Sequence, residues 1–347
     1  MAPPLIELIV PVFNEGAVIE AHLREILHRA APPPKDADPK DAAPTDAAPN
    51  DAAPKDAAPK DHAPYQLRLL VIDDGSQDDT AAALERFCAG EPRARYLSLT
   101  RNFGKEAAIS AGLDQARSDA AAVVLLDSDL QHPPEMIPAM VESWRAGYRV
   151  VEAVKHARGQ ESLSSRCFAL LFYRLFHALA NLDLRGQSDF KLLDKIVLER
   201  YRQLHERERF FRGLIQWMAY PTAQLTFEVP PRAGGESRWN RLKLLRYALR
   251  NITAFSALPL QFISGCGLVS LLVGLVFGVI ALYQKIRGEA LDGFTTVILL
   301  MIFFSGTLML SLGIIGHYLA RIYEEIKARP LYLIKPRPSP PEKDRNT

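Results

Sequence analysis

Residues 123–135 read VVLLDSDLQHPPE, an apolar run that ends in two aspartates, Asp127 and Asp129. A run rich in Val and Leu is typical of a strand that is buried on both faces of a parallel sheet. Two carboxylates at the end of such a strand favour a divalent cation, because Mg²⁺ binds one or two carboxylates together with phosphate oxygens. The alternative is a solvated loop or an acidic helix start, since a Pro-Pro-Glu sequence follows.

The flanking sequence alternates short apolar runs with segments of helical period. We expect strands at residues 5–10, 67–72, 94–99, 121–126 and 149–153, and helices at 18–28, 80–89, 105–116 and 134–146. This alternation predicts an α/β domain whose mostly parallel sheet is covered by helices on both faces. Ligands of such sheets bind beyond the carboxyl ends of the strands. Polar residues follow three of these ends: Asn14-Glu15, Asp73-Asp74 and Asp127-Ser128-Asp129.

The second of these polar segments reads VIDDGSQDDT at residues 71–80. Its glycine and capping residues indicate a turn from strand to helix, in which Ser76 or Asp78 caps the helix. Asp73 ends the strand, where its carboxylate is equally suited to accepting hydrogen bonds from a ribose or a base edge. Both interpretations stay open at this point.

Residues 31–64 interrupt the alternation with a five-residue repeat, Asp-Ala-Ala-Pro-x, that is in step from Asp41 to Asp61. A proline at every fifth position excludes a stable helix. We therefore expect a disordered, solvated insert between the first helix and the second strand. A specific docking role is the alternative.

Two apolar segments, residues 262–282 and 295–315, contain no charged residue. Each is long enough to cross a hydrocarbon core of ~30 Å as a helix. Arginine and lysine precede the first segment and follow the second, so we expect both ends in the cytoplasm and the connector, residues 283–293, outside.

Two further segments have the pattern of a helix that lies in the lipid headgroup layer. Residues 238–252 interleave arginines with apolar residues at helical spacing, just before the first apolar segment. Residues 163–182 have an apolar side formed by phenylalanines and leucines. For this second segment, an ordinary helix facing the protein core is the alternative.

The overall composition and the absence of certain motifs argue against several classes of protein. A net charge of +2 gives no indication of a nucleic-acid partner, and we expect none. Three widely spaced cysteines form no disulfide framework and fit a reducing compartment. The N-terminus lacks the pattern of a cleaved signal peptide, so we expect the first domain in the cytoplasm. No GxGxxG follows any expected strand and no P-loop is present, which argues against nicotinamide and P-loop enzymes.

Several motifs occur in a fixed order: IVPVFNE at 9–15, IDDGSQDDT at 72–80, RNFGKEAAISAGL at 101–113 and LDSDLQHPPE at 126–135. Shorter ones follow: SDFKL at 188–192, FRG at 211–213, RAGGESR at 232–238 and RIYEEIKARPLY at 321–332. Together they resemble family 2 glycosyltransferases of the GT-A (Rossmann-like) fold. The resemblance is to the polyprenyl-phosphate type, that is, bactoprenol glucosyltransferases and dolichyl-phosphate mannose synthases. It covers nearly the whole chain apart from the insert.

The resemblance implies roles for individual residues. It implies a nucleotide-sugar pocket lined by Pro11, Phe13, Glu15, Asp73, Asp127, Ser128, Arg232 and Arg238. It implies a Mg²⁺ or Mn²⁺ site at Asp127, Asp129 and Gln131, and a lipid-phosphate site at Arg158 and Arg166. Catalytic roles fall to Asp189, Arg212 and Arg238, with Asp189 as either a base or an orienting group.

The sequence departs from the family pattern at three positions. Phe13 replaces a common tyrosine, Arg238 a common lysine and His317 a common glutamate. Phe13 keeps an aromatic ring that can stack, and Arg238 keeps the positive charge. The third leaves the role of its position open.

The resemblance thus implies an enzyme of the inner membrane that transfers a sugar, with inversion, from a nucleotide diphosphate to a polyprenyl phosphate. UDP-glucose and undecaprenyl phosphate are the leading substrates. UDP-N-acetylglucosamine, GDP-mannose and UDP-aminoarabinose are alternative donors, and a non-catalytic scaffold that binds nucleotide sugar is an alternative function. A processive polysaccharide synthase is disfavoured, because the Gln-x-x-Arg-Trp motif and further membrane helices are missing from the sequence.

The expected organisation has four parts. A cytoplasmic catalytic domain spans residues 1–230, with the insert at 31–64, and a juxtamembrane interfacial segment spans 231–260. Two transmembrane helices lie within 261–320, and a cytoplasmic tail spans 321–347. We expect a homo-oligomer that forms through the transmembrane helices.

Overall fold

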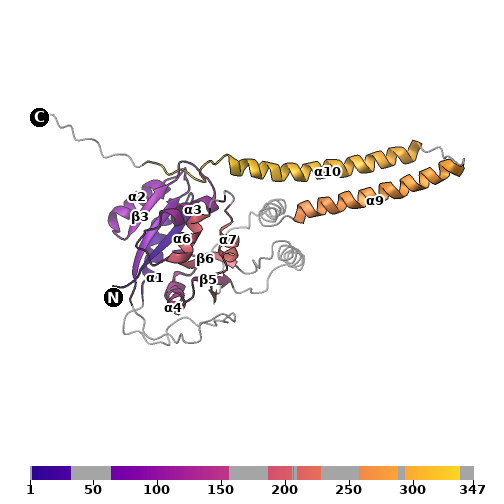
Figure 1. The fold of residues 1–347 in the computed structure, drawn as a ribbon. Helices are drawn as coiled ribbons and strands as arrows, with labels where there is room; N and C mark the ends of the chain where they lie inside the picture. Colours follow the sequence, from indigo (N-terminus) through magenta and orange to yellow (C-terminus); the bar gives the residue numbers. More distant parts are fainter. Residues whose placement is uncertain are drawn as a thin grey trace. The chain divides into compact units, whose positions relative to one another are not determined.

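The computed structural model of the chain describes residues 2–32, 64–155, 187–204, 206, 209–227, 258–287 and 294–336. They belong to two compact units (Figure 1). The first unit comprises residues 1–173, 182–236 and 330–347, and it is an α/β domain. The second unit comprises residues 174–181 and 237–329, and it contains two long apolar helices.

The described residues of the first unit form a seven-stranded sheet with the strand order β3-β2-β1-β4-β6-β5-β7. Its strands are β1 (Leu5–Val12), β2 (Gln66–Asp73), β3 (Ala94–Ser98), β4 (Ala122–Leu125), β5 (Val150–Lys155), β6 (Gln187–Asp194) and β7 (Thr222–Phe227). Only β6 runs against its neighbours, because it pairs antiparallel with both β4 and β5 while every other pairing is parallel. The amino end of β6 therefore lies at the same edge of the sheet as the carboxyl ends of the other strands.

Helices cover both faces of the sheet. One face is covered by α1 (Ile19–Arg29), α2 (Thr80–Gly90) and α4 (Ile137–Arg145), and the other by α3 (Lys105–Gln115), α6 (Lys195–Gln203) and α7 (Phe211–Trp217). Strand β2 has apolar residues on both sides: Leu69 and Val71 join the core under α1 and α2, while Leu70 and Ile72 join the core under α3. This arrangement explains why the strands of the parallel part read as continuous apolar runs.

The elements predicted between residues 5 and 155 are confirmed to within two residues at each end. The predicted helix at 134–146 begins with a short 3-10 turn, Pro134–Met136, before α4. Strands β6 and β7 and helices α6 and α7 were not predicted. They follow a stretch, residues 156–186, that lies outside the described residues, as does most of the repeat insert. The ends of that insert are joined by a hydrogen bond of 2.7 Å from the Tyr65 hydroxyl to the Ala30 carbonyl, beside the amino end of β2.

The chain returns to the first unit after its last helix. Ile334 forms an antiparallel bridge with Leu99, directly after the edge strand β3. The side chains of Tyr332 and Ile334 pack against the apolar core under α3. The edge of the sheet at β3 is therefore partly covered by residues from the end of the chain.

The second unit contains α9 (Leu258–Arg287) and α10 (Phe294–Ile326). Within the described part of the chain, residues 263–284 and 300–326 of these helices are long and apolar enough to cross a membrane. Both helices are longer than the predicted apolar segments, and almost none of their described side chains is buried. The candidate interfacial segments at 163–182 and 238–252 lie outside the described residues.

Candidate active site

A cavity of about 310 Å³ opens at the carboxyl edge of the sheet. It is lined by Pro11, Val12, Phe13, Glu15, Asp74, Asn102, Gly104, Lys105, Ala108, Asp127, Ser128 and Asp129. These residues come from the ends of β1, β2 and β4, from the loop that connects β3 to α3 and from the first turn of α3. The polar segments that the sequence places after separate strands thus meet around one cavity, as expected for this kind of sheet.

The loop after β4 is held in shape by its own polar groups. The Asp127 N–H donates to Nδ1 of His132 at 3.1 Å, and the Gln131 N–H donates to Oδ1 of Asp129 at 3.0 Å. His132 is buried and stacks on Phe190 of β6, with 5.3 Å between the ring centroids. The aspartate loop is therefore fixed to the sheet by a buried imidazole.

Lys105 joins two carboxylates that come from different strands. Its Nζ lies 2.6 Å from Oδ1 of Asp127 and 2.8 Å from Oδ2 of Asp189. Lys105 is the first residue of α3, and Asp189 stands near the amino end of β6. Burial lowers the pKa of Lys105, but the two carboxylates outweigh this effect and raise it, so the ammonium stays charged.

Arg212 binds the same aspartate from the other side. Its Nε and Nη2 donate to Oδ1 and Oδ2 of Asp189 at 2.7 and 3.1 Å. Burial would raise the pKa of Asp189, but the Arg212 hydrogen bonds and the charge of Lys105 hold that pKa well below its usual range. A carboxylate held so firmly ionised is a weak proton acceptor at neutral pH, and it is suited to orienting the two cations.

Glu106 lies beside this array and attaches α7 to α3. Its Oε2 accepts the Phe211 N–H at 3.0 Å, at the start of the helix that carries Arg212. Burial raises the pKa of Glu106 to about 7, although the Phe211 N–H and the charges of Arg212 and Lys105 oppose the shift. This carboxyl therefore titrates in the physiological range.

Glu15 places a carboxylate oxygen without a partner at the cavity. Its Oε1 accepts the Ser128 hydroxyl at 2.7 Å, while its buried Oε2 has no hydrogen-bond partner among the described residues. Burial raises the pKa of Glu15, and the Ser128 hydrogen bond only partly offsets this. A buried acceptor of this kind is costly unless a ligand supplies a donor.

The turn after β2 distributes its two aspartates differently from the sequence prediction. Oδ1 of Asp73 accepts the Ser76 N–H at 2.9 Å within the turn, whereas Asp74 is the aspartate that lines the cavity. Asp74 accepts the N–H groups of Phe103 and Gly104 at 2.8 and 2.9 Å. Asp74 thereby holds the loop between β3 and α3.

Gly75 permits this close approach of the turn to the loop. Its φ is +67°, and a Cβ atom built there would lie 2.3 Å from the Arg101 carbonyl carbon. Any other residue would have to displace backbone, so the glycine is required by both conformation and space.

The carboxylates after β4 fit a divalent cation that phosphate oxygens complete. No group of three or more His, Cys, Asp or Glu side chains is arranged to hold a metal in the described ranges. Asp127 and Asp129 do line the cavity together. This agrees with Mg²⁺ chemistry, in which one or two carboxylates act with substrate phosphates and water.

Comparisons with known proteins indicate the family of this chain. The sequence model described as Glycosyl transferase family 2 matches residues 57–200. The uncharacterized glycosyltransferase YkcC of Bacillus subtilis (strain 168) is 36% identical over 269 residues, which are 77% of this chain and 83% of that protein.

The chain belongs to glycosyltransferase family 2. It is a glycosyltransferase with the mostly parallel sheet of that family, and the matched residues include Asp74, Lys105, Asp127, Asp129 and Asp189.

Other relatives of this glycosyltransferase have more specific names. The prophage bactoprenol glucosyl transferase homolog of Escherichia coli (strain K12) is 35% identical over 273 residues, 78% of this chain and 89% of that protein. Among solved structures, glucosyl-3-phosphoglycerate synthase from Mycobacterium tuberculosis, in complex with Mn²⁺, UDP and phosphoglyceric acid, is 20% identical. The match covers 73% of this chain and 78% of that one, with a TM-score of 0.45.

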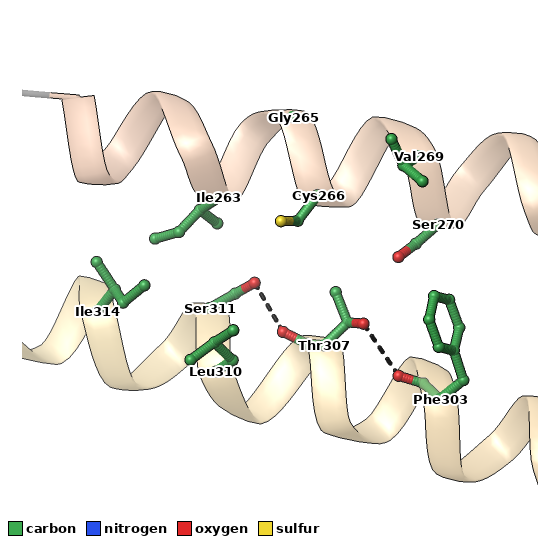
Figure 2. A pocket seen from close by; sticks show the side chains of 10 residues that line it. All are labelled: Ile263, Gly265, Cys266, Val269, Ser270, Phe303, Thr307, Leu310, Ser311 and Ile314. Atoms are coloured by element: carbon green, nitrogen blue, oxygen red, sulfur yellow. Dashed lines mark hydrogen bonds between the residues drawn. The ribbon is translucent and has the colours of Figure 1, made fainter.

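A second cavity of the glycosyltransferase has no comparable chemistry among the residues that line it. It measures about 430 Å³ and lies between α9 and α10, lined by Cys266, Ser270, Thr307, Ser311 and mainly apolar neighbours. Figure 2 shows that the Ser311 and Thr307 hydroxyls bond back to the carbonyls of Thr307 and Phe303 in their own helix. Those hydroxyls are therefore already satisfied by the helix backbone.

The predicted site residues fall into three groups. Those that line the cavity are Pro11, Phe13, Glu15, Asp127, Ser128 and Asp129. At its side, Asp189 contacts Lys105, and Arg212 contacts Asp189. Asp73 and Gln131 lie in the adjoining turns, where their hydrogen bonds shape the backbone. Arg158, Arg166, Arg232 and Arg238 lie outside the described residues.

Lys105, Glu106 and His132 were not predicted as site residues. All three lie inside sequence motifs of the family, RNFGKEAAISAGL and LDSDLQHPPE. A Lys-Glu pair directly after a glycine, at the start of a helix that follows a strand, was the available signal for the first two. Nothing local indicated that they face Asp189 and Phe211.

Proposed function

We propose that this glycosyltransferase moves a sugar, with inversion, from a nucleotide diphosphate sugar to a polyprenyl phosphate. The leading substrates are UDP-glucose and undecaprenyl phosphate. The observation that carries the proposal is the cavity in which Asp127 and Asp129 meet the charged array of Lys105, Asp189 and Arg212. The names of the bactoprenol glucosyl transferase relatives support the acceptor and the sugar.

The donor would bind with its nucleotide toward Glu15 and its diphosphate toward Asp127 and Asp129. The unpartnered Oε2 of Glu15 is suited to a donor N–H or O–H of the nucleotide. Phe13 is 41% exposed at the cavity, where its ring is available for stacking. Arg232 and Arg238 are proposed to face the diphosphate.

Asp127 and Asp129, with Gln131, would hold Mg²⁺ or Mn²⁺ against the donor diphosphate. When bound, such a cation neutralises the charge that grows on the leaving diphosphate. Lys105 is placed to assist, because its ammonium already lies at Asp127. Arg212 holds Asp189 so that the positive charge of Lys105 stays directed at the cavity edge.

The acceptor needs no strong base. A phosphate monoester has a second pKa near ~6, so it is largely dianionic at neutral pH and carries no proton that must be removed. Catalysis then rests on positioning the acceptor and on stabilising the departing diphosphate. The ion-paired state of Asp189 supports an orienting role for this residue rather than a basic one. A single displacement gives a β-linked product from an α-linked donor.

We propose that Arg158 and Arg166 bind the lipid phosphate. Replacing either arginine by alanine should raise the KM for lipid phosphate several-fold while leaving UDP affinity unchanged. A loss of UDP affinity with an unchanged lipid KM would show that these arginines bind the donor instead.

We propose that the enzyme sits at the cytoplasmic face of the inner membrane, with α9 and α10 as its two spans. The basic flanks of the apolar segments support this orientation. Chain connectivity supports it as well, because only residues 327–329 separate α10 from the segment that belongs to the first unit. The exit of α10 and the catalytic domain should therefore be on the same side. Association of copies through these helices remains a proposal.

One experiment tests the reaction directly. Purified full-length protein is incubated with undecaprenyl phosphate, Mg²⁺ or Mn²⁺ and separate nucleotide sugars, and the lipid products are identified by mass spectrometry. We expect glycosyl phosphoundecaprenol from UDP-glucose together with release of UDP. If no donor in a panel that includes UDP-N-acetylglucosamine, GDP-mannose and UDP-aminoarabinose yields a lipid product, the proposed acceptor is wrong.

A further inference from the structure

The segment that follows the second apolar helix forms part of the catalytic domain. Residues 330–335, the C-terminal strap, run antiparallel to the chain that leaves β3. The Thr100 N–H donates to the Leu333 carbonyl at 2.9 Å, and the Lys335 N–H donates to the Ser98 carbonyl at 2.7 Å. Because β3 is the edge strand of the sheet, its outer backbone groups are free to make this pairing.

Side chains of the strap strengthen the pairing. Tyr332 and Ile334 pack against the core formed by Leu70, Ile72, Leu99, Ala108 and Ala111. The Tyr332 hydroxyl donates to Oδ2 of Asp114 in α3 at 3.0 Å. Oδ1 of Asp114 lies 3.6 Å from Nη1 of Arg209, in the chain that leads into α7. The strap therefore contacts residues on both sides of Lys105 in the chain: Ser98 and Thr100 before it, and Asp114 after it.

The loop held by the strap leads directly into the cavity. Thr100 bonds to the strap, and Asn102, Gly104 and Lys105 line the cavity a few residues later. On its other side, Phe103 and Gly104 donate hydrogen bonds to Asp74. Lys105, at the end of the loop, is held by the carboxylates of Asp127 and Asp189. Phe103 also packs against the same core as Tyr332 and Ile334. Asp74 and the strap thus restrain the loop from opposite ends.

We propose that the C-terminal strap positions the cavity loop, residues 100–105, for binding of the nucleotide diphosphate. It is a positioning element, because it reaches the ligand only through that loop. Without it, the end of the loop at Thr100 would lose its restraint, and the loop would more often sample conformations in which Lys105 leaves Asp127 and the cavity. The proposal rests on the proposed function in taking the cavity to be the donor site.

A matched pair of variants tests the strap in the full-length protein in lipid nanodiscs. Lys335→Pro removes the N–H that donates to Ser98, whereas Lys335→Ala removes the same exposed ammonium and keeps the N–H. For the proline variant, we expect the rate of amide hydrogen exchange in residues 99–105 to rise about tenfold. This is near the lower end of the coupling typically found between two sites of one protein. The dissociation constant of UDP with Mn²⁺, measured by calorimetry, should rise by a similar factor. The alanine variant should behave as wild type in both measurements.

A purely structural role predicts a different result. Lys335→Pro would then lower the Tm, but its UDP affinity and its rate of loop exchange would equal those of Lys335→Ala. This outcome would overturn the proposal. If Lys335→Pro does not fold, Tyr332→Phe removes only the hydroxyl that binds Asp114 and should raise the rate of amide exchange in the loop about threefold, as expected for the loss of one hydrogen bond. No change in either measurement for this variant would also overturn it. The exchange measurement needs no ligand, so failure of the wild-type protein to bind UDP counts against the proposed donor alone.

Discussion

Replacing Glu106 by glutamine should stabilise the catalytic domain at pH 8 and stabilise it far less at pH 5. The pKa of this carboxyl is raised by burial from 4.5 to about 7, so the folded protein favours the protonated form. Below pH 4.5 the carboxyl is protonated in both the folded and the unfolded state. Between pH 4.5 and about 7 the unfolded chain releases a proton that the folded protein keeps, so the free energy of unfolding falls as pH rises. Above pH 7 that loss is complete.

The size of the effect follows from the shift. A rise from 4.5 to about 7 corresponds to about 3 kcal/mol at roughly 1.4 kcal/mol per pKa unit. Because Glu106 is only partly buried, screening by solvent reduces this to about 2 kcal/mol. The glutamine Oε1 can still accept the Phe211 N–H, so the link between α3 and α7 is kept. For a domain of this size, about 2 kcal/mol raises the Tm by roughly 4–8 °C.

The measurement is a thermal scan of the full-length protein in detergent, at one scan rate and at several pH values from 5 to 8. Glu85→Gln is the matched control, because Glu85 is an exposed glutamate on α2. The difference in Tm between Glu106→Gln and wild type should grow with pH, while Glu85→Gln should show no such trend. A constant difference across this range, or no stabilisation at pH 8, would refute the reasoning.

Three further predictions test the site, the topology and the insert. Asp129→Asn should lower turnover by roughly 10²-fold while Tm stays within a few degrees, because it removes one ligand of a cation that stabilises the leaving group; equal turnover in EDTA and in Mg²⁺ would contradict this. A cysteine introduced between Tyr283 and Gly293 should be labelled from outside intact cells, whereas labelling of one in residues 337–347 would overturn the topology. Replacing residues 32–63 with a short Gly/Ser turn should keep kcat within a few-fold and not lower the Tm, since each doubling of loop length costs only about 0.6 kcal/mol. A large loss of activity in a folded protein would mean that the repeat contacts the site or a partner.

Much of the catalytic domain was predictable because its signals are local. Strands β1 to β5 and helices α1 to α4 follow from apolar period and turn residues, which act over a few neighbouring positions. The aspartates after β4 could be placed at the cavity for the same reason, since a residue directly after a parallel strand lies at the carboxyl edge. The local pattern could not decide which aspartate after β2 lines the cavity. That choice depends on Gly75 and on the loop that Asp74 binds.

Tertiary structure alone decided how the charged array forms. Strand β6 enters the sheet antiparallel between β4 and β5, and this reversal places Asp189 at the same edge as Asp127. Lys105 and Arg212 reach Asp189 from two helices that are far apart in the sequence. Strand order and helix docking are set by long-range packing, for which no short sequence period exists. The strap is the clearest case: the sequence indicates a tail after an apolar helix, but only the fold reveals that its backbone pairs with the edge of the sheet beside the cavity.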